Sequence, residues 1–193
     1  MPTVSTEGWG LYSEFLGLEM GLFEADKLAE FGFYSFNLLR ACRLVVDTGI
    51  HAMNWTRDQA VDFMMENTPA ARHVVESEVD RYITLPGQAL AYKIGERNIK
   101  KVRAEARERM GEQFDLREFH RTVIQCQGPL PVLESCVDTW ARGRVGGSFA
   151  SCPLCPVTSG EAGGQVSGAE RTGVMTSVLV MVGVMGIVRG LYL

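Results

Sequence analysis

Four polar side chains recur along the segment 25–52, which is otherwise rich in Leu, Phe and Val. Arg40, Arg43, Asp47 and His51 are spaced by 3, 4 and 4 residues, so on a helix they share roughly a quarter of the circumference. A helix that is apolar on its other sides is buried, and buried charges are costly unless they are paired. The stripe is either an internal Asp–Arg network that fixes packing, or a substrate-facing surface. In the second case Arg40 and Arg43 would bind a carboxylate or phosphate, and His51 would transfer a proton or form a hydrogen bond.

A second candidate is the stretch "RYITLPGQALAYKIG", residues 81–95. Gln88 and Tyr92 are four residues apart and therefore neighbours on one helix face. A tyrosine hydroxyl beside a cleft can donate a hydrogen bond to a developing oxyanion. The alternative is a half-buried Tyr92 whose hydroxyl lies at the surface. Gly95 follows as a position where another backbone can approach closely.

Near the start of the chain, "TEGWGLYSE" carries two acids, Glu7 and Glu14, seven residues apart. Seven residues is nearly two helical turns, so both carboxylates lie along one line of a mostly apolar helix. Three glycines of the same segment, Gly10, Gly17 and Gly21, are expected to allow close approach of a neighbouring backbone.

Local metal and nucleophile motifs are lacking. The sequence has no H-E-x-x-H, and its three histidines are far apart, so no complete zinc site follows from motif evidence. A single C-x-x-C at Cys152 and Cys155 is a weak signal. Of the other histidines, His73 is expected at the surface, while His120 suits either helix packing or a cleft.

The elements that position these residues are expected to be helices throughout, because apolar residues recur at helical spacing and no alternating strand pattern stands out. Thr56 with Gln59 has the spacing of a capping box, and Asp115 can cap the segment after it. Pro86 suits the first turn of a helix that Gly111 ends. The expected helices are 6–22, 25–52, 56–68, 70–83, 86–110, 116–127 and 131–140.

Composition divides the 193 residues into two kinds of polypeptide. Nearly all charges, and the whole net charge of −4, lie in residues 1–144, whereas residues 145–193 hold only Glu161, Glu170, Arg171 and Arg189. We expect one helical domain at 1–144, a disordered Gly/Ser/Pro-rich linker at 145–171 and an apolar tail at 172–192. The net charge argues against a nucleic-acid partner.

The tail contains seventeen uncharged residues, 172–188, just before Arg189. A spanning helix needs about 17 residues or more, so a C-terminal transmembrane segment is one interpretation. The others are a sticky tail, or translation of sequence outside the normal reading frame or exon. The chain would be located at a membrane through this tail, or in the cytoplasm, since its first residues lack a signal peptide. Five cysteines, an odd number, without a signal peptide indicate reduced thiols.

Several long motifs together resemble one family, the domain of unknown function 885, which is regarded as a group of zinc metallopeptidases. They are "EGWGLYSEFLGLEMG", "LLRACRLVVDTGIHAMNWTRDQAVDFMMENT", "EVDRYITLPGQALAYKIG", "FDLREFH" and "LPVLESCV". The resemblance covers about residues 7–140. It implies an all-α fold, namely the multi-helix C-terminal part of a zincin-like metallopeptidase domain.

The resemblance also implies roles for individual residues. Family members carry an H-E-x-x-P-G-H motif upstream, and Glu7 would be the third protein ligand of their Zn²⁺. Arg43, His51, Gln88 and Tyr92 would face the cleft, where they would bind substrate or stabilise the tetrahedral intermediate. Together with Arg40 from the polar stripe described above, they give Tyr92 and His51 as candidate catalytic groups, and Arg40, Arg43 and Gln88 as candidate substrate-binding groups. Glu14 is expected to be a supporting residue or the partner of one of the arginines.

This sequence departs from the family in lacking the His-Glu motif. The expectation is a truncated member of a peptide-hydrolysing family that is inactive alone, with an incomplete gene model as one explanation. The alternative is a non-catalytic helical module, anchored at a membrane by the tail or binding a partner.

Overall fold

The structure, a computed structural model, describes residues 3–126 and 128–146. The chain divides into two compact units, Met1–Cys155 and Pro156–Leu193, and all described residues belong to the first. Within them every regular element is helical, as the sequence predicts, and there is no strand. The elements are α1 (Thr3–Glu19), α2 (Lys27–Ala52), α3 (Arg57–Asn67), α4 (Arg72–Thr84), α5 (Leu90–Met110), the 3₁₀ helix η1 (Gly111–Gln113), α6 (Leu116–Gln125) and α7 (Leu130–Gly146).

Side-chain caps define where several helices begin. The Asp26 carboxylate accepts from the first backbone N–H groups of α2. Thr56 and Gln59 form the predicted capping box of α3, and Asp115 caps α6 by accepting from the Glu118 N–H at 2.9 Å. These contacts satisfy backbone donors that a helix leaves unpaired at its start.

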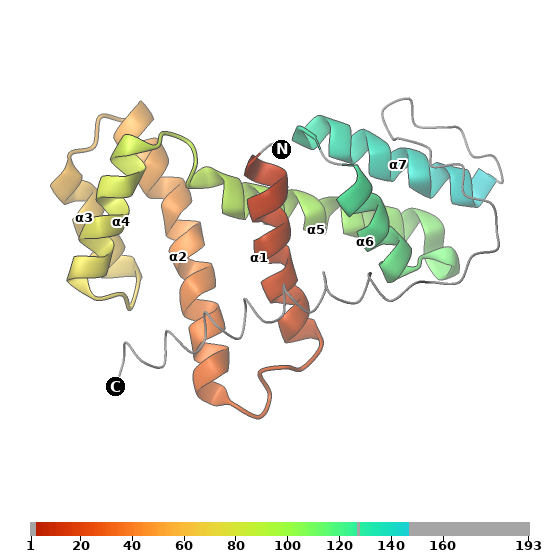
Figure 1. The fold of residues 1–193 in the computed structure, drawn as a ribbon, viewed down its shortest axis with the longest axis horizontal. Helices are drawn as coiled ribbons and strands as arrows, with labels where there is room; N and C mark the ends of the chain where they lie inside the picture. The colour runs from red at the N-terminus through yellow and green to blue at the C-terminus, as the bar shows by residue number, and fades with distance from the viewer. Residues whose placement is uncertain (1–2, 127, 147–193) are drawn as a thin grey trace, which may run out of the picture. The chain divides into compact units, whose positions relative to one another are not determined.

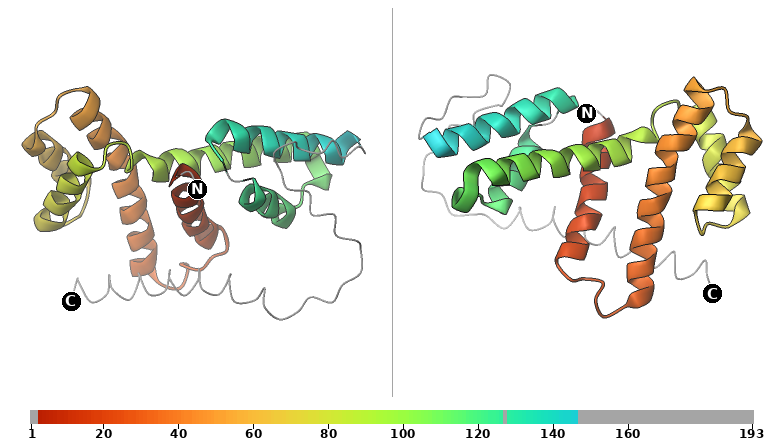
Figure 2. Two further views of the ribbon diagram at one scale, coloured as in Figure 1. Left: turned by 45° about the horizontal axis from the view of Figure 1, so that its top comes forward. Right: turned by 180° about the vertical axis from the view of Figure 1, so that it is seen from behind.

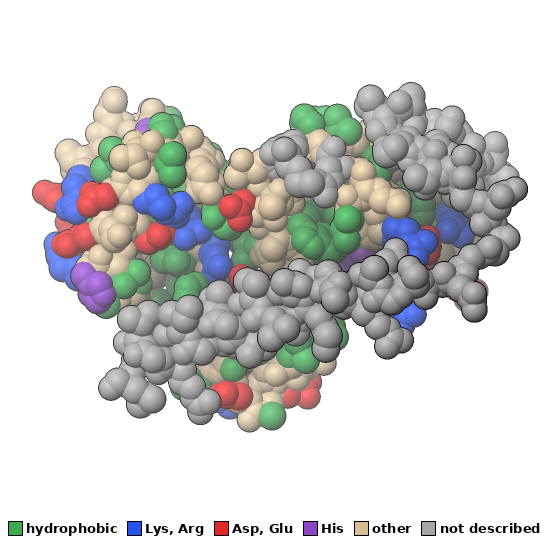
Figure 3. Space-filling view, viewed as in Figure 1, with side chains coloured by type: hydrophobic (Ala, Val, Ile, Leu, Met, Phe, Trp, Pro, Cys, Tyr) green, Lys and Arg blue, Asp and Glu red, His purple; other side chains and the backbone are tan. Residues whose placement is uncertain are grey.

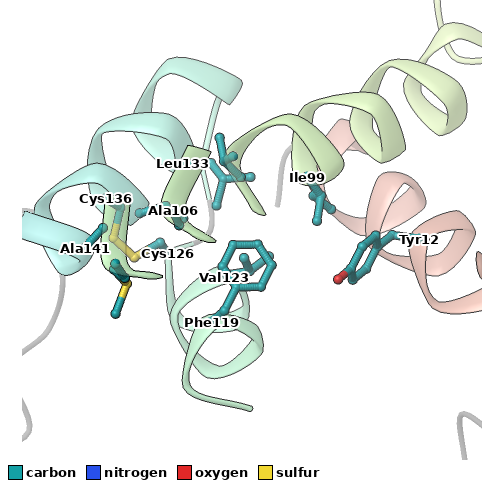
Figure 4. Close-up of a cluster of buried hydrophobic side chains, with 12 residues drawn as sticks. Tyr12, Ile99, Ala106, Phe119, Val123, Cys126, Leu133, Cys136 and Ala141 are labelled. Atoms are coloured by element: carbon teal, nitrogen blue, oxygen red, sulfur yellow. A yellow bond between two sulfur atoms is a disulfide. The ribbon is translucent and has the colours of Figure 1, made fainter. Parts of the chain in front are cut away.

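Helix α5 runs between two groups of helices, with α2, α3 and α4 near its start and α6 and α7 near its end (Figures 1 and 2), and each group has a hydrophobic core. One is built by α2, α3 and α4 and includes Val46, Met64 and Tyr82. The other lies where α1 crosses α5 and where α6 and α7 pack, with Tyr12 and Phe119 fully buried (Figure 4). Helix α5 contacts α1, α2 and α7, so it joins both cores.

The crossing of α1 and α5 depends on two glycines, Gly8 and Gly95. A Cβ atom at Gly95 would overlap the Val4 carbonyl oxygen and lie 2.6 Å from the Gly8 Cα, and one at Gly8 would overlap the Gly95 backbone. Close approach at Gly95 is therefore confirmed. The prediction of Gly10, Gly17 and Gly21 as sites of close backbone approach is wrong, because a Cβ at Gly10 would meet nothing within 4 Å and a Cβ at Gly17 or Gly21 would meet only side chains.

The start of α5 also differs from the prediction. The helix begins at Leu90 rather than at Pro86, and Gly87 adopts a positive φ of 78° in the turn before it. The Gly87 N–H donates to both carboxylate oxygens of Asp47, at 3.2 and 3.1 Å. The buried carboxylate on α2 thus holds a turn that only glycine adopts readily, and this turn presents Gln88.

The prediction that all thiols are reduced is wrong for one pair. Cys126 at the end of α6 and Cys136 in α7 form a disulfide (Figure 4), whereas Cys42 is a buried free thiol. The two cysteines are 10 residues apart in sequence, but the number of cysteines gave no indication that these two side chains meet.

Breaking this disulfide is expected to lower the free energy of unfolding by about 2–3 kcal/mol, because the crosslink restricts the unfolded chain over a short loop. Denaturant unfolding of the oxidised and the reduced protein measures the difference. The double variant Cys126→Ala/Cys136→Ala is the control, since reductant should leave its midpoint unchanged. Equal stability of the oxidised and reduced native protein would contradict the prediction.

The predicted linker at 145–171 falls outside the described residues apart from its first two positions, and the predicted tail at 172–192 lies wholly outside them. None of the helices in residues 3–126 and 128–146 combines the length and the apolar character needed to cross a bilayer. The fold supports the all-α prediction, and the zincin-like assignment receives no support from it.

Candidate functional site

Glu7, Gln88 and Tyr92 lie together where α1 meets the start of α5. The Gln88 Nε2 donates to Glu7 Oε1 at 3.4 Å and to the Tyr92 hydroxyl at 3.3 Å. All three side chains are half-buried. The contact across 81 residues follows from the Gly8–Gly95 crossing, because Glu7 precedes Gly8 and Tyr92 lies three residues before Gly95.

Arg81, on α4, determines which way the Gln88 amide points. Its Nη1 donates to Gln88 Oε1 at 2.8 Å, and arginine has no acceptor. The amide oxygen must therefore face Arg81, which directs the NH₂ group toward Glu7 and Tyr92. This arrangement makes Gln88 a donor to the Glu7 carboxylate.

The Glu78 carboxylate is the centre of the charged network behind this group. It accepts from Arg43 Nη2 at 2.7 Å, from Arg81 Nη2 at 3.0 Å and from the Tyr82 hydroxyl at 2.7 Å. Burial acts to raise the pKa of Glu78, but the hydrogen bonds from Arg81, Tyr82 and Arg43 outweigh it and lower the pKa to about 2. Glu78 is thus an anion at any pH near neutrality.

Arg43 connects this network to Tyr92. Its guanidinium is buried, donates from Nε to the Tyr82 hydroxyl at 2.9 Å, and lies 4.8 Å from the centre of the Tyr92 ring. A cation against the face of an aromatic ring is attracted to it. Arg43 therefore helps to hold the Tyr92 ring in position.

Arg40 pairs with Glu14, which confirms the predicted arginine partner of that acid. The Arg40 Nη2 lies 3.1 Å from Glu14 Oε1. Burial raises the pKa of Glu14 and lowers that of Arg40, so desolvation of this pair outweighs its mutual attraction. In addition, the buried Nε and Nη1 of Arg40 have no acceptor among the described residues.

The remaining members of the α2 stripe, Asp47 and His51, make contacts with backbone. Asp47 holds the Gly87 turn, and the His51 Nε2 lies 2.9 Å from the Tyr82 carbonyl oxygen, which joins α2 to α4. Among the described residues, the stripe contains no Asp–Arg ion pair. Its members contact α1 through Arg40, α4 through Arg43 and His51, and the turn before α5 through Asp47.

The other two histidines, His73 and His120, lie in different surroundings. His73 is exposed at the start of α4. The His120 Nε2 lies 2.9 Å from the Tyr12 hydroxyl, and its ring packs against Trp9 and Phe119. His120 is therefore a helix-packing residue, and burial lowers its pKa.

Within residues 3–126 and 128–146, no group of three or more His, Cys, Asp or Glu side chains is placed to hold a metal ion. Glu7 is a single carboxylate with an amide donor beside it.

Comparison with known proteins identifies the family of the chain. The model of the family described as "Bacterial protein of unknown function (DUF885)" matches residues 1–137. The chain belongs to this family. No curated protein matches the sequence.

A solved structure with a similar sequence supports the fold. The crystal structure of a candidate lipoprotein from Colwellia psychrerythraea is 44% identical in sequence, with a TM-score of 0.71. The match covers 73% of this chain and 24% of the Colwellia chain. The present chain thus spans about a quarter of the length of that relative.

Sequence reasoning missed the acid at the centre of the site, Glu78, and the orienting group, Arg81. A signal was present in "EVDRY", where Glu78, Arg81 and Tyr82 have the spacing of one helix face. This spacing could have identified Glu78, Arg81 and Tyr82 as one cluster, but it could not have shown that Arg43 contacts them.

Proposed function

We propose that this chain forms one wall of a zinc peptidase site. Glu7 is one carboxylate ligand of the metal, while Gln88 and Tyr92 bind and polarise a peptide carbonyl group. The proposal is supported by the resemblance of "EGWGLY" to the family's metal-ligand motif, in a chain that belongs to the DUF885 family.

The observation that carries the proposal is the contact of Gln88 with both Glu7 and Tyr92. A metal-ligating carboxylate is usually held by a hydrogen bond from a neighbouring group. Gln88 has this relation to Glu7, and Arg81 fixes its orientation. The Tyr92 hydroxyl lies beside the same amide, so it is placed to donate to an oxygen that gains charge.

The described residues do not fit a zinc ion by themselves. A catalytic zinc takes three protein ligands and keeps one position open, and here one carboxylate is present without two further ligands. No hydrolytic step is therefore assigned to the isolated chain. We propose that its zinc affinity is weak and that the remaining ligands belong to the rest of a complete family domain.

The proposed roles of Arg40, Arg43 and His51 are supported by different observations. Arg40 has two buried donors without an acceptor in the described part of the chain, which supports a role in binding a substrate carboxylate. Arg43 acts through Tyr92. His51 is an exposed residue whose imidazole contacts the α4 backbone, and its proposed role in proton transfer rests on its place in the polar stripe of α2 and on the family resemblance.

Zinc titration of the purified full chain tests this proposal. We expect less than one tightly bound zinc per chain and no chelator-sensitive hydrolysis of a peptide library, because the described part of the chain offers Glu7 no partner ligands. The variant Glu7→Gln is the matched control and should titrate like the native chain. Robust zinc-dependent turnover by the native chain would refute the proposal.

The second candidate function is that of a non-catalytic helical module that binds a protein partner. It is favoured by one observation, an exposed apolar face on α2.

A further inference from the structure

Helix α2 has an outer face that no described element covers. Large apolar side chains follow one another along it: Phe31 is 59% exposed, Tyr34 52%, Leu38 45% and Val45 43%. Leu28 and Met53, 67% and 64% exposed, extend the row at either end. Soluble monomers rarely leave a contiguous apolar surface of this kind uncovered.

The side chains on the inner side of α2, by contrast, pack in a core or form ion pairs. Leu39 and Val46 belong to the core shared with α3 and α4, and Arg40 and Arg43 pair with Glu14 and Glu78. The outer apolar face, defined here as Phe31, Tyr34, Leu38, Ala41 and Val45, is therefore a separate surface rather than the edge of a core.

The spacing of the outer face favours one kind of occupant. Phe31, Leu38 and Val45 repeat every seven residues, with Tyr34 and Ala41 between them. This is the pattern of a seam that packs against another α-helix. From Phe31 to Val45 it runs for about 21 Å at the rise of an α-helix, which is the length of about four turns.

The nearby surface of α3 and α4 has a different character. It carries acidic and basic side chains intermingled (Figure 3), including the exposed pairs Arg57–Asp80 and Arg72–Glu76. Such a surface needs no cover.

The Colwellia relative indicates where the occupant comes from. It shares this fold at 44% identity, and only 24% of its chain corresponds to the present one. The other three quarters of that chain can provide a helix for the same face.

We propose that the outer apolar face of α2 is a docking site for an amphipathic α-helix from the part of the DUF885 domain that lies outside the matched quarter. The inference rests on family membership and on α2 alone, and is independent of the proposed zinc site.

Cysteine labelling tests this inference. Leu38→Cys and Val45→Cys are made in the full chain and in a chimera, in which the full chain replaces the matching quarter of the Colwellia protein. Maleimide labelling is followed peptide by peptide by mass spectrometry. In the chimera, labelling at both positions should slow by about tenfold or more, the protection given by about 1.4 kcal/mol of docking free energy.

The matched control is Val74→Cys on α4, a residue of similar exposure, 40%, on the charged surface. Its labelling rate should be the same in both proteins. Unchanged labelling at positions 38 and 45 in the chimera overturns the proposal. Equally slow labelling at these positions in the chain alone also overturns it, because the chain's own residues would then cover the face. Protection that grows with the concentration of the chain alone overturns it as well, because the occupant would then be a second copy of the chain.

A second measurement needs no chimera. The double variant Leu38→Glu/Val45→Glu in the full chain should bind less of an apolar-surface dye and associate less than the native chain, while Val74→Glu should leave both unchanged. Dye binding unaffected by the double variant shows that the face is not an open apolar surface, and overturns the proposal.

Discussion

Replacing Glu78 with Gln is expected to lower the free energy of unfolding by about 2–3 kcal/mol, because it leaves the buried Arg43 without its anion. The carboxylate accepts hydrogen bonds from Arg43, Arg81 and Tyr82, and glutamine retains its shape but not its charge. The Glu78 side chain is 23% exposed, so solvent screens part of the loss. Denaturant unfolding at pH 7 measures the difference.

The same variant changes the response to acid. The pKa of Glu78 falls from an ordinary value of 4.5 to about 2 in the folded protein, so its contribution is fully present above about pH 5 and is lost as the pH falls toward 2. The native chain should lose about 2 kcal/mol more over this range than Glu78→Gln.

A matched control lies on the same helix. Glu76→Gln removes the acid of the exposed Arg72–Glu76 pair and should cost less than about 0.5 kcal/mol. Equal losses for Glu76→Gln and Glu78→Gln would show that the network around Glu78 contributes no more than a surface ion pair.

The substitution Gly95→Ala is expected to cost about 3 kcal/mol, although alanine is the better helix former. The added Cβ would overlap the Val4 carbonyl oxygen and lie 2.6 Å from the Gly8 Cα. Both obstacles are backbone, so no side-chain rotation relieves them, and α1 has to move away from α5. Thermal unfolding measures the loss.

Gly10→Ala is the control for Gly95→Ala. Nothing lies within 4 Å of a Cβ at Gly10, so this variant should gain about 0.5–1 kcal/mol from helix propensity. Because the crossing of α1 and α5 brings Glu7 to Gln88, Gly95→Ala should also alter the NMR signals of the Gln88 side-chain amide. A variant with native stability and an unchanged Gln88 signal would disprove the role of the crossing.

The local features of the fold were predictable because they depend on neighbours in sequence. The Thr56–Gln59 capping box and the Asp115 cap were expected from spacing, and both are present. The contact between Gln88 and Tyr92 was likewise expected from their separation of four residues.

Partners distant in sequence were beyond the same reasoning. Helical periodicity shows that Arg43 faces inward, but its partner Glu78 is 35 residues away on another helix. Two further contacts between different helical segments were also not predictable, namely Gly8 with Gly95 and Cys126 with Cys136. Each depends on how two helices cross, and the periodicity of a single helix contains no such information.

Zinc content of the chimera tests most directly whether Glu7 is a metal ligand. Elemental analysis after extensive dialysis is made for the chimera and for its variants Glu7→Gln and Glu14→Gln. We expect close to one zinc per molecule in the chimera and in Glu14→Gln, because Glu14 pairs with Arg40, and a loss of bound zinc in Glu7→Gln. A chimera that holds no zinc, or one that keeps its zinc when Glu7 is replaced, would contradict the assignment.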